Sequence, residues 1–434
     1  MQYRSPLLRI ALFPLLASCT FAPQPSHTAS ATCVEQRLLE NLNMSEGGRL
    51  TIALSGDLAK ADLTFLAEGP LTMVKEVDRL LVYADYGSTD AGTLHVTCPA
   101  GENRVPITVR QIAWSKVASW TSGGPPGREY GAWWLDDADD RLFVFGGFQY
   151  DPVQYTPAND LWSFDLAKKE WSAQKQVGDA PLSPGGRVAH ATAPNSLYFF
   201  GGVVKATSAT PPVMKILDYS GESPSWSDAP FASTSPGSYT GSLVYDARRK
   251  RWLSVCGGSS NGFNCDVNAY SPTVGWGSLA LAAGDQPKGR DGFHYAYDEE
   301  TDRVFIYGGQ VGAGNLAMIG DTWALELGET PAQWVKLVDE SDMPGKRRNG
   351  AYALDPIGRR LLVWGGTPDG AHSVDGLQVL GLDRGRETWT SVSVPAEVPP
   401  RCSAMGAYDA RRNQVFWGFG NNTTVYSDIW AMSL

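Results

Sequence analysis

Short apolar runs, most of them about five residues long, follow one another along most of the chain and are separated by Gly, Asp, Ser or Pro. Runs of that length, rich in β-branched and aromatic residues and bounded by turn formers, are typical of strands. We therefore expect an all-β protein. Within residues 33–111 the predicted strands are Leu50–Leu54, Asp62–Leu66, Arg79–Tyr83, Thr93–Thr97 and Val105–Val109.

A longer pattern starts at about residue 112, where an apolar run that ends in a glycine pair recurs about every 51–57 residues. Such a period indicates a repeat architecture. The pairs are Gly146-Gly147, Gly201-Gly202, Gly257-Gly258, Gly308-Gly309 and Gly365-Gly366, and Gly418–Gly420 is a degenerate sixth copy. An Asp or Asn that predicts a tight turn precedes each run, such as Asp136 in the first copy and Asn195 in the second. Eight residues before this turn residue, five copies carry an arginine: Arg128, Arg187, Arg290, Arg347 and Arg401.

Two further features follow the glycine pairs. A third strand carries Asp-x-Trp, as at Asp160-Leu-Trp162, and a fourth strand begins at Trp171, Trp226, Trp276, Trp334 or Trp389. In these features residues 112–434 resemble the kelch repeat, in which each copy is one four-stranded blade of a β-propeller. The resemblance implies a six-bladed kelch-type propeller, in which the glycine pairs let blades approach closely and the tryptophan fills the wedge between them.

The two ends of the array suggest how the ring closes. The sixth repeat ends after its third strand at Leu434, whereas an unassigned Trp120 precedes the first repeat. We expect Trp120 to mark the fourth strand of the sixth blade, so that pairing of the chain ends satisfies both open strand edges. The strands of residues 33–111 resemble bacterial immunoglobulin-like sandwiches, and this implies a small Ig-like β-sandwich before the propeller.

Residues 1–19 have the pattern of an export signal. Arg4 and Arg9 precede a short apolar segment that ends in Leu16-Ala17-Ser18-Cys19. This ending resembles the lipobox of bacterial lipoproteins, which implies cleavage before Cys19 and lipidation of its side chain; an ordinary signal peptide is the alternative. Thr20 after the cysteine resembles an outer-membrane address. Residues 20–32, rich in Pro, Ser and Thr, are a predicted flexible tether.

Six cysteines occur in the chain, and export would place them in a disulfide-permissive compartment. Their spacing within single predicted modules favours the pairs Cys33–Cys98 and Cys256–Cys265, which leaves Cys402 as a reduced, buried thiol. The sequence contains no C-x-x-C pair or Cys/His cluster. We therefore expect neither a metal nor any other cofactor.

Composition excludes several classes of protein. The 434 residues carry 36 Lys and Arg against 46 Asp and Glu, a net charge of −10 without a basic run, so nucleic acid is a poor partner. Aromatic residues make up 11%, which argues against a disordered chain. The apolar segments are too short for a transmembrane helix.

Candidate binding residues fall on one face of the predicted propeller, the face on which kelch proteins generally bind partners. The five arginines would ring this face, where they could hold a carboxylate or sulfate or, alternatively, bond carbonyls between blades. Exposed aromatic residues on the loops between second and third strands suit contact with carbohydrate or protein: Phe148, Tyr150 and Tyr155 on 148–159, and Phe263 on 259–266. A structural role is favoured for His190 and His294, and solvated turns rather than calcium sites for Asp136–Asp140 and Asp298–Asp302.

These features favour a monomeric, membrane-anchored, extracytoplasmic kelch propeller in the cell envelope that binds a protein or glycan, and they supply no nucleophile with its base. One alternative is an exported kelch enzyme such as a sialic-acid mutarotase-like sugar epimerase, which could use Glu129, Arg187, His190 and His294 near the axis. Another is a structural envelope protein without a small ligand. The cysteines do not match the constellation of the kelch-type copper-radical oxidases.

Overall fold

The computed structural model describes residues 33, 42–54, 63–88, 91–151, 154–182, 185, 187–190, 195–202, 214–231, 240–259, 262–312, 317–342 and 344–434. Over these residues every regular element is a strand, as the pattern of short apolar runs predicts. No helix in this part of the chain is long and apolar enough to cross a membrane. Contacts divide the chain into an N-terminal unit, up to Ala113, and a main unit that contains Trp114–Asp355 and Arg360–Ser433.

The N-terminal unit has two sheets, with strand orders β1-β7-β6-β3 and β2-β5-β4. Their inward residues, such as Ile52, Val82, Val96 and Ile107, share one core, because the alternating pattern of each strand turns its apolar side inward. The prediction missed β1 and β4. The strands are β1 (Asn43–Ser45), β2 (Arg49–Ala53), β3 (Thr64–Glu68), β4 (Leu71–Lys75), β5 (Arg79–Ala84), β6 (Gly92–Cys98) and β7 (Gly101–Arg110).

The main unit contains six antiparallel sheets that follow one another along the chain. Each is built from consecutive strands except the fourth, which skips two short strands, and the sixth. The first sheet contains β10 (Ala132–Asp136), β11 (Arg141–Asp151), β12 (Gln154–Asp165) and β13 (Glu170–Gln174), with β9 (Arg128–Glu129) paired to β11. The second contains β14 (Arg187–His190), β15 (Ser196–Phe200), β16 (Lys215–Asp218) and β17 (Ser225–Asp228), and the third contains β18 (Val244–Asp246), β19 (Arg251–Ser259), β20 (Gly262–Ser271) and β21 (Gly275–Ser278). The fourth contains β22 (His294–Asp298), β23 (Arg303–Tyr307), β26 (Thr322–Glu326) and β27 (Gln333–Val338), the fifth β28 (Ala351–Asp355), β29 (Arg360–Trp364), β30 (Leu377–Gly381) and β31 (Trp389–Val392), and the sixth β32 (Met405–Asp409), β33 (Gln414–Gly418), β34 (Asp428–Ser433) and β8 (Ala113–Ser119). The short pair β24 (Gln310–Val311) and β25 (Ala317–Met318) lies outside them.

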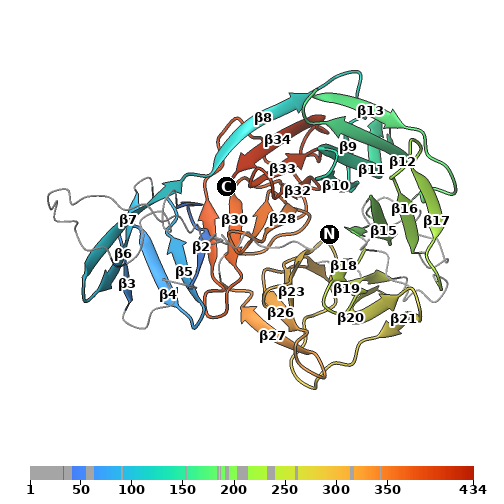
Figure 1. Ribbon diagram of the computed structural model, residues 1–434. Coiled ribbons are helices and arrows are strands. Elements are labelled where there is room, and N and C mark those ends of the chain that lie inside the picture. Colours follow the sequence, from blue (N-terminus) through green and yellow to red (C-terminus); the bar gives the residue numbers. More distant parts are fainter. Residues whose placement is uncertain are drawn as a thin grey trace, which may run out of the picture. The chain divides into compact units, whose positions relative to one another are not determined.

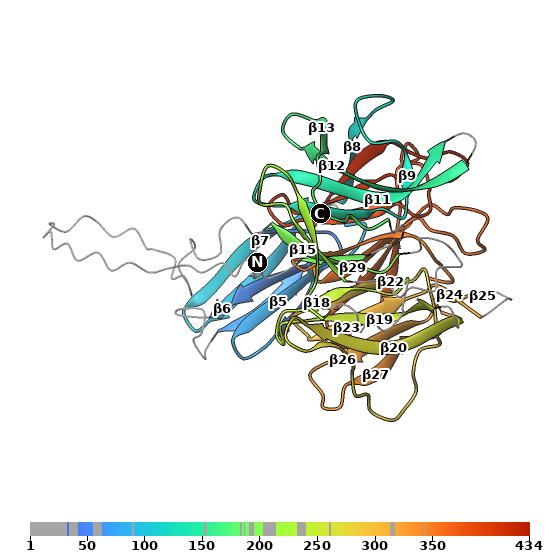
Figure 2. The ribbon, with the colours of Figure 1, turned by 90° about the vertical axis from the view of Figure 1, so that its right-hand side faces the viewer.

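The first strands of the six sheets lie innermost in the main unit. Strands β10, β14, β18, β22, β28 and β32 contact one another in chain order, and β32 also contacts β10. Figures 1 and 2 show the sheets of this unit side by side around a common centre. The sixth sheet takes its outermost strand, β8, from the N-terminal side of the array.

A tryptophan near the start of each fourth strand packs on the preceding sheet. Trp226 lies 4.7 Å from Phe145, Trp276 lies 4.7 Å from Phe200, and Trp389 lies 4.4 Å from Tyr307, measured between ring centroids. In the sixth sheet the residue in this place is Trp114, whose ring lies 5.4 Å from that of Trp364. The prediction that Trp120 marks the fourth strand of this sheet is therefore wrong, because Trp114, six residues earlier, holds that position. Trp120 packs nearby, on Phe419 and Trp171.

The glycine pairs allow neighbouring sheets to approach closely. A Cβ atom added to Gly308 would lie 2.2 Å from the carbonyl oxygen of Arg347, and one on Gly365 would lie equally close to that of Arg401. Both glycines also have positive φ angles, of 69° and 66°. Their partners Gly309 and Gly366 donate backbone hydrogen bonds of 2.8 and 2.9 Å to the same two carbonyls. A side chain at either position would separate adjacent sheets.

Candidate functional site

A cavity of about 230 Å³ opens at the centre of the main unit, enclosed by the six innermost strands. Each first strand, or the residue just before it, contributes one residue to the wall at an equivalent position: Trp133, Val188, Leu243, Tyr295, Tyr352 and Gly406. The wall is therefore largely apolar and aromatic. Its polar side chains are those of Tyr130, Arg187, Asn349 and Ser403, together with the hydroxyl groups of Tyr295 and Tyr352.

Three of the predicted arginines do not face this cavity. Arg128, Arg290 and Arg401 are fully buried, and each forms a two-pronged ion pair with the aspartate of an Asp-x-Trp motif. Each also donates to a carbonyl at the glycine-pair position, as from Arg290 Nη1 to Gly308 at 3.1 Å. The structural alternative therefore describes them: they lock the second and third strands of one sheet together, with their charge already neutralised.

Two of these aspartates, Asp160 and Asp321, have a lowered pKa and remain ionised inside the protein. Burial alone would raise the pKa of Asp321, but its hydrogen bonds and charge interaction with Arg290, and the bond from Trp323, bring the pKa below its usual value. Asp160 and Asp428 accept from Trp162 and Trp430 in the same way. Arg347 has no such aspartate and bonds instead to the carbonyls of Gly365 and Gly376. The hydrogen bonds of these four arginines therefore lie within their own sheets.

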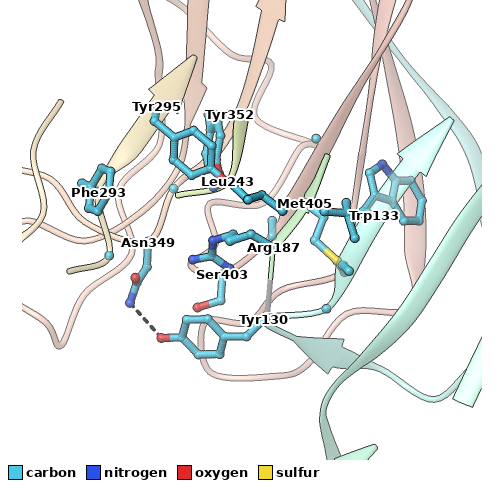
Figure 3. A pocket seen from close by; sticks show the side chains of 17 residues that line it. Tyr130, Trp133, Arg187, Leu243, Phe293, Tyr295, Asn349, Tyr352, Ser403 and Met405 are labelled. Atoms are coloured by element: carbon cyan, nitrogen blue, oxygen red, sulfur yellow. Dashed lines mark hydrogen bonds between the residues drawn. The ribbon is translucent and has the colours of Figure 1, made fainter. Parts of the chain in front are cut away.

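Arg187 differs from the other four because it occupies a different place in its sheet. It pairs with Phe200, immediately before a glycine pair, as Ala132 pairs with Phe145, whereas Arg128 lies four residues before Ala132. The spacing of eight residues misaligned this repeat. Asn195, with φ of 58°, corresponds to Asp140 at the end of its turn, with φ of 56°, and not to Asp136. Arg187 is consequently part of the cavity wall (Figure 3).

The Arg187 side chain forms no ion pair with any carboxylate in the described part of the chain. Its Nη1 donates to the carbonyl of Gly185 at 2.8 Å, and its buried Nε has no hydrogen-bond partner there. Burial alone would lower the pKa of Arg187, but Tyr352, Tyr295 and Asp291 nearby reverse that effect, and the net shift is upward. The guanidinium is therefore always charged.

Hydroxyl and amide groups lie at one side of the cavity. Asn349 Nδ2 donates to the Tyr130 hydroxyl at 2.8 Å, and the same hydroxyl hydrogen-bonds with Ser403. Figure 3 shows Tyr130, Ser403 and Asn349 on the side toward which the Arg187 side chain extends. Burial raises the pKa of Tyr130, so its phenol stays protonated and the cavity gains no negative charge from it.

Four ionisable groups flank the cavity without lining it. Glu129 accepts a hydrogen bond from Asn421, and burial raises its pKa to about 7. Asp291 has a raised pKa because of burial, although the charges of Arg187 and Arg348 oppose the shift. Arg348 donates to Gln310. Cys402 is a free, half-buried thiol 3.2 Å from the Ser373 hydroxyl, and burial raises its pKa.

The predicted aromatic loops are partly strand. Strands β11 and β12 extend as a hairpin past the glycine pair, and the ring of Phe148 lies 6.4 Å from that of Tyr130. Strands β19 and β20 also extend as a hairpin, which carries the half-buried Phe263. Residues 148–159 and 259–266 are therefore not simple loops. The side chains of Tyr150 and Tyr155 lie outside what the structure describes.

His294 has a structural role. It is fully buried, and its ring nitrogens contact the Tyr307 carbonyl at 3.2 Å and the Gly350 N–H at 2.9 Å. Burial lowers its pKa to about 3, so it is neutral. The side chain of His190 lies outside the described part of the chain.

Carboxylates of the two acidic turns form ion pairs with arginines. In the first of them, Asp140 pairs with Arg411 and Arg412, and Asp139 pairs with Arg141. In the second, Asp302 pairs with Arg249. Over the residues described, no group of three or more His, Cys, Asp or Glu side chains is placed to hold a metal ion.

The structure pairs the cysteines as the spacing predicts. Cys33 and Cys98 form one disulfide, with Cα atoms 5.6 Å apart, and Cys256 and Cys265 form another. The predicted lipidation site, Cys19, lies outside the described residues.

Sequence reasoning missed most of the cavity wall. Tyr307 and Trp364 each precede a glycine pair, and they pair with His294 and Ala351 of the first strand. The next residues along that strand are Tyr295 and Tyr352, so counting the strand register back from each glycine pair would have found them. The same count would have separated Arg187 from the four buried arginines.

Comparison with protein families gives a match to one domain model over most of the chain. The KLHDC2/KLHL20/DRC7 Kelch-repeats domain matches residues 103–280 and 273–434. Those two segments include every strand of the six sheets.

Among curated proteins, putative adagio-like protein 2 of Oryza sativa subsp. japonica is 27% identical over 311 residues, 68% of this chain and 46% of that protein. Adagio-like protein 1 of the same plant is 25% identical over 355 residues, 76% of this chain and 54% of that protein. Tip elongation aberrant protein 1 of Schizosaccharomyces pombe is 25% identical over 245 residues, 54% of this chain and 20% of that protein. The chain thus spans about half or less of these relatives.

Proposed function

We propose a recognition function for this chain, which belongs to the kelch-repeat family. Kelch domains generally bind proteins, and a fold alone does not name the ligand. The observation that carries the proposal is the central cavity, whose wall holds a charged Arg187 without an ion-paired carboxylate among the described residues. Because a buried charge in a protein is ordinarily paired, a ligand that completes the contacts of Arg187 is favoured.

We further propose that the six sheets are the blades of a closed propeller. The contact between β32 and β10 and the placement of β8 beside β34 support this arrangement. A closed ring leaves no unpaired sheet edge between the first and sixth blades. It also brings six equivalent positions to one axis, where a ligand meets side chains from every blade.

The cellular setting is a proposal that rests on residues 1–32 alone. The lipobox-like Leu16–Cys19 supports a lipid anchor in the cell envelope, with the outer membrane as its address and residues 20–32 as the tether. The matched relatives named above are eukaryotic and lend it no support. The Cys19→Ser variant should be uncleaved or soluble, whereas the parent should fractionate with membranes and carry acyl chains by mass spectrometry. A mature N-terminus elsewhere, without lipid, would contradict the anchor.

The enzyme alternative has less support from the geometry. Of the four residues it would use, His294 is buried with both ring nitrogens in contact with the backbone, and Glu129 is bonded to Asn421 outside the cavity wall. Of the three whose side chains the structure describes, Arg187 lines the cavity and has donors without a partner among the described residues. The N-terminal unit, with its two sheets around one core, fits the proposed Ig-like module.

Site-specific cross-linking in cells tests the recognition function. A photoreactive phenylalanine analogue at Phe148, near Tyr130, should capture a recurrent partner. The same analogue at Phe231, an exposed phenylalanine that does not line the cavity, should not. Equal capture at both positions, or none at Phe148, would contradict recognition at this face.

A further inference from the structure

From the cavity wall we infer that the ligand bears a carboxylate, which Arg187 binds through one edge of its guanidinium, with an apolar or aromatic group directly attached to it. This inference rests on the proposed recognition function and specifies its ligand chemistry. It starts from charge. Arg128, Arg290 and Arg401 are each neutralised by an aspartate, whereas Arg187 forms no ion pair within the part of the chain that the structure describes.

The second repeat departs from the first at both positions of the ion pair, the arginine and the aspartate. Counting on from Phe199, which pairs with Lys215, aligns Val213 in the sequence with Asp160 of the first repeat. The second repeat therefore has valine where the first, fourth and sixth repeats have the aspartate. Arg187 lies four residues further along its repeat than Arg128 does in the first repeat, and this position is in the cavity wall. The charge and the missing carboxylate thus occur in one repeat.

Hydrogen-bonding capacity defines the shape of the missing group. A guanidinium has five N–H donors in a plane. In Arg187 only Nη1 donates, to Gly185, which leaves Nε and the Nη2 beside it without partners among the described residues. Two parallel donors along one edge match the two oxygens of a carboxylate. The protonated Tyr130 hydroxyl and the Ser403 hydroxyl lie on the side toward which Arg187 extends (Figure 3). They hydrogen-bond with each other, so one of the two keeps its hydrogen for a ligand.

The surroundings favour a single negative charge. Arg348, the other cation nearby, already donates to Gln310, and Asp291 lies close enough to interact with both arginines. A doubly charged phosphate would therefore meet one available cation and one carboxylate. Away from Arg187 the wall is apolar and aromatic, with Trp133, Leu243, Tyr295, Tyr352 and Met405. A carboxylate with a ring or alkyl group attached satisfies both parts of the cavity.

Such a carboxylate could belong to a free small acid or to the chain terminus of a bound protein, and binding assays separate the two. Benzoate and its neutral isostere benzamide represent the free acid; N-acetylphenylalanine and its amide represent a chain terminus. Sulfate tests anion binding without an apolar group. Calorimetry or ligand-observed NMR is carried out on the full chain and on Arg187→Met, Arg187→Lys and Arg104→Met, the last at an exposed arginine of the N-terminal unit.

We expect one of the two acids to bind the parent and Arg104→Met equally, and its amide at least tenfold more weakly. Arg187→Met should lose at least tenfold, and Arg187→Lys should fall between, because lysine keeps the charge but not the two-donor edge. The acid that binds identifies the source. A Met variant that melts like the parent but binds the acid unchanged would overturn the inference, and so would equal binding of acid and amide, or tighter binding of sulfate than of either acid.

The cross-linking experiment at Phe148 separates this inference from the recognition function. If Phe148 captures a partner but neither acid binds, recognition stands and the carboxylate is wrong. If an acid binds through Arg187 but Phe148 captures nothing, the carboxylate site stands and recognition of a macromolecular partner is wrong.

Discussion

Arginine has two roles in the main unit: some arginines are buried in ion pairs, and Arg187 lines the cavity. Arg290 is completely buried with Asp321 and Gly308 as partners, whereas Arg187 keeps two donors for a ligand. The stability of substituted proteins should show this difference. Arg290→Met leaves Asp321 charged and unpaired and should cost about 3–5 kcal/mol of unfolding free energy. Arg187→Met breaks no ion pair among described residues and should cost less than about 1 kcal/mol.

Urea titration of both variants, followed by tryptophan fluorescence, measures the two costs directly. Arg104→Met serves as the control for loss of a surface arginine. Similar losses for Arg187→Met and Arg290→Met would show that Arg187 is another structural arginine.

Glu129 gives a prediction about pH. Its folded pKa, about 7, lies above the ordinary value of 4.5, because burial disfavours the carboxylate. The folded state therefore binds the extra proton between these values, and this residue's contribution to stability decreases as pH rises from about 4.5 to about 7. Glu129→Gln stays neutral and can keep the bond from Asn421. It should be more stable than the parent at pH 8, by about 1–2 kcal/mol, and nearly equal to it at pH 4.5.

Thermal melts of parent and Glu129→Gln at several pH values between 4.5 and 8 measure that difference. Gln286, an exposed glutamine, provides a Gln→Glu control. A constant difference between parent and variant across this range would show that Glu129 titrates normally.

At the scale of elements, a histidine ties three strands of the N-terminal unit together. His95 on β6 contacts Glu102 on β7 at 2.5 Å and Glu68 on β3 at 3.0 Å. Its pKa is raised, first by the hydrogen bond with Glu102, and the pKa of Glu102 is lowered by the same bond. The histidine's contribution to stability is lost as pH rises above 6.5 and through its folded pKa, and the glutamate's is lost as pH falls below 4.5.

His95→Asn should therefore destabilise the N-terminal unit most between about pH 4.5 and 6.5, and less at pH 8. Amide hydrogen exchange in β6 and β7, compared between parent and variant at pH 5.5 and pH 8, reports on this unit without interference from the main unit. Faster exchange by the same factor at both pH values would mean that His95 acts only through packing.

Much of the element pattern could be predicted from sequence, because glycine pairs and alternating runs are local features. The errors arose where one repeat departs from the others. In the second repeat Asn195 stands at the end of its turn, whereas Asp136 stands at the start of the turn in the first repeat. Counting eight residues back from Asn195 therefore placed Arg187, wrongly, in line with the buried arginines. Trp114 and Trp120 both precede the first repeat, and only the bounds of β8 show that Trp114, and not Trp120, stands near the start of the strand. Pairing between distant strands, which fixes both positions, leaves no local trace.

At the scale of the whole main unit, ring closure depends on β8. Deleting residues 33–105 removes most of the N-terminal unit and leaves β8 with its wedge residue Trp114. Deleting 33–122 also removes β8 and should leave β34 with an open edge. We expect the first protein to melt like the parent's main unit and the second to aggregate or melt far lower. Equal melting temperatures would contradict closure by β8.

Trp114→Ala isolates the packing part of this effect. It removes the ring that packs on Trp364, at a cost of about 3–5 kcal/mol, and leaves the backbone of β8 intact. Trp120→Ala is the matched control, and because Trp120 follows the strand we expect a smaller loss of stability from it.

The position of β8 has a mechanical consequence. The chain passes from β7 directly into β8, which is the outermost strand of the sixth sheet, and the other strands of that sheet come from the far end of the sequence. A pulling force from the N-terminal side therefore reaches the main unit at the β8–β34 seam before any other strand pair. If this protein is tethered to a membrane, β8 is the strand that takes up the force from the tether, and it is also the strand whose pairing with β34 closes the proposed ring.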